Sequence, residues 1–98
     1  MPTTREVEAL IIESVRLLAE DFDIEGLKQA GKETSLYGNE GSLDSMGLVN
    51  LIADVEDAIH SKYDLSVALV DEKAVSSRNS PFLNVGTFTR AVMERLPQ

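Results

Sequence analysis

One segment decides the fold that we expect for this chain: Gly41-Ser42-Leu43-Asp44-Ser45-Met46-Gly47-Leu48-Val49-Asn50-Leu51-Ile52. Asp44 and Ser45 both suit a helix N-cap, because their side-chain oxygens accept hydrogen bonds from backbone N–H groups that have no partner within the helix. The apolar residues after them recur at helical spacing: Leu48, Leu51, Ile52, Val55 and Ile59. This spacing predicts an amphipathic helix over residues 45–61, with the Ser45 hydroxyl reachable from solvent at its N-terminal end.

Two further amphipathic helices are predicted on either side of this segment. Thr3 and Glu6 have the spacing of a capping box, and a helix is expected from about residue 5 to about residue 20. Its apolar face contains Val7, Leu10, Ile11, Ser14 and Leu18, with Val15 and Leu17 beside it. Asn84 suits the N-cap of the last helix. The apolar face of that helix contains Val85, Phe88, Thr89, Val92 and Leu96.

The connections between these helices are expected to pack on the bundle and not to form a sheet. Four apolar residues of the first connection can be buried there: Ile24, Leu27, Leu36 and Tyr37. Residues 25–30 can form a helical turn, and residues 71–75 a short third helix. Residues 63–69 alternate between apolar and polar, but without a second strand to pair with we expect an extended connection. The prediction is an all-α, four-helix bundle with three longer helices and one short one, in a single domain spanning residues 1–98.

Composition limits the classes of function that the chain can have. It has 98 residues, a formal net charge of −8 and no Cys. The charge disfavours nucleic acid and anionic membrane surfaces, and it favours partners with basic patches. Without Cys, thioester chemistry would need a thiol supplied by a cofactor. Since no signal peptide or membrane-length apolar segment is visible, we expect a cytoplasmic monomer without stable membrane insertion.

The residue types and their spacing give little support for a metal site or an enzyme active site. Residues 21–26 resemble the start of an EF-hand loop, but the twelfth position, which should provide a bidentate Glu, is Lys32. We therefore expect no metal site. The single His, His60, falls late in the second predicted helix, and no Ser-His-Asp arrangement or glycine-rich phosphate loop stands out. We expect no catalytic residues and no enzymatic activity.

The segment from residue 44 onward resembles the attachment motif of acyl carrier proteins. The resemblance rests on Asp44-Ser45-Met46, on Leu48-Val49 and Leu51-Ile52, and on the acidic residues Asp54, Glu56 and Asp57. Residues 34–37 are similar to the family's loop before the motif, and residues 80–85 to the start of its last helix. In that family the Ser after the Asp carries a 4′-phosphopantetheine arm. The resemblance therefore implies that Ser45 is the attachment site, and it implies the same helix bundle as the apolar spacing.

The resemblance also implies a function. The thiol of the arm would hold acyl intermediates as thioesters and present them to successive enzymes, while the chain itself catalyses nothing. Expected partners are a phosphopantetheinyl transferase and acyl-transferring or acyl-modifying enzymes with basic patches. Asp44 would cap the helix, or help to position the transferase's metal and the Ser45 hydroxyl. Candidates for contacts with partners, the arm or its cargo are Met46, Val49, Leu51, Val55, Asp54, Glu56 and Asp57.

The residues leave several alternatives open. The cargo could be an amino acid, as in aminoacyl or peptidyl carriers, or the chain could be an unmodified acidic adaptor that binds a basic partner. Met46 and Val49 could instead pack under the preceding loop. Gly47 and Asn50 stand where fatty-acid carriers often have acidic residues. This departure favours a specialised lipid or secondary-metabolite pathway over housekeeping fatty acid biosynthesis.

Overall fold

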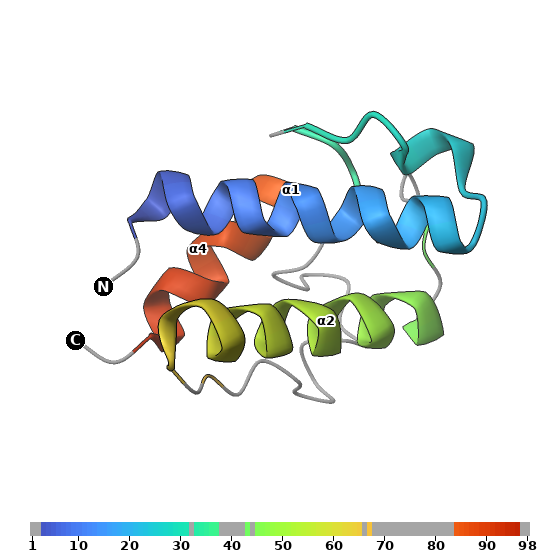
Figure 1. Cartoon of the computed structure of the whole chain (residues 1–98). Helices are drawn as coiled ribbons and strands as arrows, with labels where there is room; N and C mark the ends of the chain where they lie inside the picture. The colour runs from blue at the N-terminus through green and yellow to red at the C-terminus, as the bar shows by residue number, and fades with distance from the viewer. Residues whose placement is uncertain are drawn as a thin grey trace.

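The described part of the chain contains three α-helices in the computed structural model (Figure 1). Helix α1 spans Thr4–Asp21, α2 spans Ser45–Tyr63, α4 spans Val85–Arg95, and a short 3₁₀ helix, η1, spans Glu25–Leu27. The structure describes residues 3–31, 33–37, 43, 45–65, 67 and 84–96, with the backbone alone at residue 45. Within these residues no strand forms, which confirms the all-helical class. The short helix predicted at residues 71–75 lies outside them.

Helix α1 begins with the capping box that the sequence predicts. The Thr3 hydroxyl accepts from the Glu6 N–H at 3.2 Å, and the Glu6 carboxylate accepts from the Thr3 N–H at 3.1 Å. Both bonds satisfy backbone N–H groups at the start of the helix. The buried face contains Val7, Leu10, Ile11, Ser14, Val15, Leu18 and Ala19. Leu17 lies away from this face and is 55% exposed.

Helix α2 buries its predicted apolar face completely. Leu48, Leu51, Ile52, Val55 and Ile59 are each 0% exposed. The helix continues through Tyr63, two residues beyond the predicted end, so Tyr63 ends the helix and does not begin an extended segment. The chain then leaves the helix at Asp64, whose φ of 55° is left-handed. After it, Leu65 is partly buried and Val67 is buried, outside any helix or strand.

Helix α4 is capped by Asn84, as predicted. The Asn84 side chain accepts from the Thr87 N–H at 2.8 Å, and the Thr87 hydroxyl accepts from the Asn84 N–H at 3.2 Å. The predicted apolar face is buried: Val85, Phe88, Thr89, Val92 and Leu96. Thr89 is the polar member of this face. Its hydroxyl donates to the Val85 carbonyl at 2.8 Å, so burial leaves no donor without a partner.

Helix α1 packs against α2, α4 and η1. Figure 1 shows α2 running in the opposite direction to α1, with α4 crossing near the end where α1 begins. At that end, the hydroxyl of Tyr63 donates to the Glu6 carboxylate at 3.4 Å. At the other end, residues from the end of α1 and from the start of α2 line one hollow. The antiparallel arrangement therefore places the end of α1 beside the start of α2.

The first connection packs on the bundle, as expected. Leu27 and Leu36 are fully buried, while Ile24 and Tyr37 are partly buried against the core. The Arg16 side chain, although on the exposed side of α1, donates to the Ala30 carbonyl at 3.0 Å. The described part of the connection is thus held to the bundle by apolar burial and by a side-chain hydrogen bond from α1 to a carbonyl of the connection.

Candidate functional site

The start of α2 is the first candidate region. The backbone becomes helical at Ser45, which agrees with the predicted helix start. The preceding described residue, Leu43, is 6% exposed, and its N–H donates to the Leu36 carbonyl at 2.9 Å. Asp44 and the side chain of Ser45 lie outside the described part of the structure. The predicted exposure of the Ser45 hydroxyl therefore stays a prediction.

The first turns of α2 present apolar side chains to solvent. Met46 is 81% exposed and Val49 is 40% exposed. Ala53, one turn further along this side of the helix, is exposed as well. Leu51 and Val55 are fully buried, which makes them core residues and not surface contacts.

The carboxylates expected beside this surface differ in exposure. Asp54 and Asp57 are exposed, while Glu56 is partly buried. Desolvation raises the pKa of Asp54 above its usual value, and repulsion from Asp21 and Asp57 raises the pKa further. The Asp21 contribution places a carboxylate from the last residue of α1 near this side of α2. The acidic surface is therefore built from two helices.

A hollow of about 780 Å³ lies between the end of α1 and the start of α2. We call it the α1–α2 hollow. From α1 and the turn after it come Leu18, Phe22 and Ile24; the other lining residues are Leu43, Met46, Gly47, Val49, Asn50 and Ala53. Its volume falls within the range of about 300–1,000 Å³ that is typical of small-molecule pockets. The expected contacts Met46 and Val49 are both in its lining, and so are Gly47 and Asn50.

Phe22 is a large apolar member of this site that the sequence analysis does not assign to it. It is the cap residue at the end of α1 and is 62% exposed. A signal was present, since Phe22 follows the buried Leu18 by four residues and so falls on the same side of a helix. The sequence alone does not show that the start of α2 lies beside Phe22.

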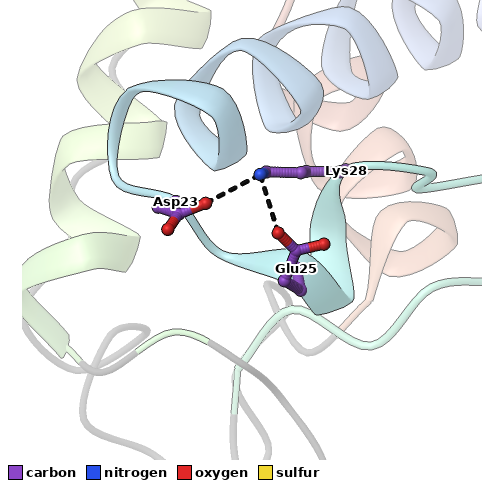
Figure 2. Close-up of polar contacts among 3 residues, drawn as sticks. All are labelled: Asp23, Glu25 and Lys28. Atoms are coloured by element: carbon purple, nitrogen blue, oxygen red, sulfur yellow. Dashed lines mark hydrogen bonds and ion pairs between the residues drawn. The ribbon is translucent and has the colours of Figure 1, made fainter.

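In the EF-hand-like segment, the carboxylates contact a cationic side chain of the protein itself (Figure 2). The Lys28 ammonium contacts Asp23 at 2.7 Å and Glu25 at 2.8 Å. The ammonium donates hydrogen bonds to Asp23 and to Glu25, and these bonds, the one to Asp23 first, raise the pKa of Lys28 above its usual value. These carboxylates occupy the third and fifth positions of the EF-hand pattern, and here they hold a side chain of the protein itself. Among the described residues, no three metal-binding side chains of His, Cys, Asp or Glu gather.

Comparison with known proteins gives no relative for this site. No model of a known protein family matches the chain, and no curated protein or solved structure matches it. In the described part of the chain, every helix is too short or too polar to pass through a bilayer. The similarity to acyl carrier proteins thus rests on the residues quoted above.

Proposed function

We propose that this chain is a carrier protein whose Ser45 hydroxyl is esterified by 4′-phosphopantetheine. The observation that supports it most is the position of Ser45, which directly follows Asp44 in the sequence and is the first residue of α2. The first N–H groups of a helix have no acceptor within the helix, and the helix dipole is positive at that end. A phosphodiester attached there would be stabilised by both effects.

The residues around this position fit such an arm. The fully buried face of α2 fixes the helix, and the Leu43–Leu36 hydrogen bond holds the chain immediately before it. When bound, the arm supplies the thiol that a chain without Cys lacks, and thioesters of acyl groups form on thiols. The protein contributes a fixed attachment point and a surface by which partner enzymes recognise it.

The surface next to Ser45 supports transient binding to enzymes. Met46 and Val49 are exposed, and the exposed carboxylates of Asp54 and Asp57 lie on the same helix. Such a surface suits a phosphopantetheinyl transferase, and acyl-transferring or acyl-modifying enzymes, that present basic patches. Gly47 and Asn50 give the start of α2 less negative charge than fatty-acid carriers often have. We infer a specialised lipid or secondary-metabolite pathway, with an aminoacyl or peptidyl cargo as the alternative.

A second candidate function follows from the same exposed surface. Met46, Val49 and the nearby carboxylates could bind a basic partner without any arm on Ser45, and the chain would then be an unmodified helical adaptor. The carrier requires modification of Ser45 and the adaptor does not, so a test for this modification distinguishes the two functions.

The test is the intact mass of the chain after incubation with coenzyme A and a broad-specificity phosphopantetheinyl transferase. We expect the wild type to gain one phosphopantetheine group and Ser45→Ala to gain none, with the helical circular dichroism signal unchanged. Ser61→Ala is the matched control, because Ser61 is an exposed serine near the opposite end of α2. A wild type that stays unmodified would favour the adaptor. A mass gain by the Ser45→Ala variant would show that another residue, for example Ser42, is the attachment site.

A further inference from the structure

We propose that the α1–α2 hollow is a docking site for a partner protein that inserts an apolar side chain with a basic residue beside it. The proposal rests on the partner-binding surface proposed above, and it goes beyond attachment at Ser45 because it adds the end of α1 to that surface and states what the partner inserts. It also does not require the arm, since the hollow is present in the chain itself.

Large, solvent-exposed side chains form the apolar part of the site. Phe22 is 62% exposed, Met46 is 81% exposed, and both line the same hollow. Exposed apolar residues scattered singly are ordinary, whereas a group that lines a concave surface marks an interaction site. The bottom of the hollow is preformed, because Leu18 and Leu43 are 2% and 6% exposed. A partner's apolar side chain would be partly removed from water there.

The charged part of the site lies beside Phe22 and Asn50. Asp21 precedes Phe22 at the end of α1, and Asp54 follows the lining residue Asn50 by one turn of α2. Asp21 and Asp54 are both exposed. Their negative charges repel each other, and Asp57 adds to the repulsion. A cation from a partner would relieve this repulsion and form favourable pairs of its own. The site therefore combines an apolar hollow with a cation-binding edge.

This combination argues for a basic partner protein over other occupants. A second copy would carry the same net charge of −8, so two copies would repel. Nucleic acids and anionic membranes are negatively charged too. The arm proposed for Ser45 would bring a phosphodiester, which is also negative. A protein segment with Arg or Lys next to a large apolar residue complements both parts of the surface.

The experiment is an NMR titration of isotope-labelled Ser45→Ala chain with a synthetic helical peptide that has one Phe between two Arg residues. Because this chain cannot be modified at Ser45, a failure of the carrier function appears in the mass assay and leaves this titration unaffected. We expect saturable shift changes concentrated at the amides of Phe22, Met46 and Val49. Higher salt should weaken binding, because the Debye length falls to about 3 Å at 1 M.

Two variants and one peptide control make the test specific. Adding Phe22→Ala should weaken binding about tenfold, from the loss of one large apolar contact. Adding Leu17→Ala should change it by less than about twofold, since Leu17 is similarly exposed on α1 but outside the hollow. The same peptide with Glu in place of Arg should not bind.

Several outcomes would overturn the proposal. They are no saturable binding at millimolar peptide, shifts concentrated around Leu17, or equal binding of the Glu peptide. Concentration-dependent dimerisation through Phe22 would identify a second copy as the occupant. Shifts across the hollow when the wild-type chain is modified, without peptide, would identify the arm.

Discussion

The backbone N–H of Leu43 donates to the carbonyl of Leu36 at 2.9 Å, two residues before α2 begins. In the same segment, the Thr34 carbonyl accepts from the N–H of Val85, the first residue of α4, at 3.1 Å. Leu36 is fully buried between these two hydrogen bonds. Residues 34–36 therefore connect the start of α2 with the start of α4.

The first prediction is that Leu36→Ala destabilises the fold strongly. Loss of a fully buried Leu side chain costs about 2–5 kcal/mol in unfolding free energy, from lost burial and from the cavity left behind. This is a large part of the roughly 5–15 kcal/mol that a typical domain has. Urea denaturation measures the effect. Leu17→Ala is the control and should cost about 0.5 kcal/mol or less, since Leu17 is exposed. Equal losses for the two variants would contradict the structural role of Leu36.

The helices and their caps could be predicted because their signals are local. The capping boxes at Thr3 and Asn84 lie within three residues of their partners, and each apolar face repeats every three or four residues. The end of α2 was less predictable. Apolar alternation from Tyr63 onward indicated an extended segment, whereas Tyr63 closes the helix and its hydroxyl contacts Glu6 on α1. That contact joins residues far apart in the sequence.

The candidate site also has one part that local sequence patterns predict and another part that they do not. Exposed Met46 and Val49 follow from their place opposite the buried face of α2. The contribution of Phe22 and Asp21 does not, because it depends on the antiparallel packing of α1 and α2. No local pattern fixes which ends of two helices meet. The sequence therefore indicates half of the docking surface, and tertiary structure adds the other half.

The second prediction concerns acid stability at Glu6. Hydrogen bonds from the Thr3 backbone and side chain lower the pKa of Glu6 below its usual 4.5. A lowered folded-state pKa means that the charged carboxylate stabilises the fold above pH 4.5, and that this contribution is lost as pH falls through the folded pKa. Glu6→Gln keeps a capping-box acceptor but removes the charge. Its Tm should be below that of the wild type at pH 7, and the two Tm values should converge once the pH falls below the folded-state pKa of Glu6.

The control for this prediction is Glu13→Gln, which removes an exposed carboxylate from the same helix outside the capping box. Thermal melts at a series of pH values measure both variants. A Glu6→Gln difference that stays constant from pH 7 to low pH would show that the charge does not contribute.

The third prediction is that Asp54→Asn stabilises the chain while weakening the docking of a basic partner. Desolvation, followed by repulsion from Asp21 and Asp57, raises the pKa of Asp54 above 3.8. A raised carboxylate pKa means that the charged form is disfavoured by folding, so the cost is present at neutral pH and disappears as pH falls below the unfolded value. Asp54→Asn should therefore raise Tm modestly at pH 7 and leave it unchanged at acid pH.

Two measurements check the third prediction together. Thermal melts give stability, with Glu94→Gln as a control because Glu94 is an exposed carboxylate on α4. The peptide titration gives binding, which should weaken as stability rises. A variant that loses stability at pH 7 would show that Asp54 has a favourable structural partner.

The last prediction concerns Gly47 in the first turn of α2. Gly is about 1 kcal/mol less favourable than Ala within a helix, and an acidic residue in the first turn gains about 0.3–1 kcal/mol from the helix dipole. Gly47→Asp should therefore keep the unfolding free energy or raise it by up to about 1 kcal/mol, despite the added negative charge. The variant also restores an acidic residue where fatty-acid carriers often have one. If Gly47 marks a specialised carrier, a housekeeping fatty-acid phosphopantetheinyl transferase should modify Gly47→Asp faster than the wild type. Adding Asn50→Glu should increase the rate further, and the initial rate of mass gain at fixed salt measures all three chains. Equal rates would remove the sequence support for a specialised pathway while leaving attachment at Ser45 intact.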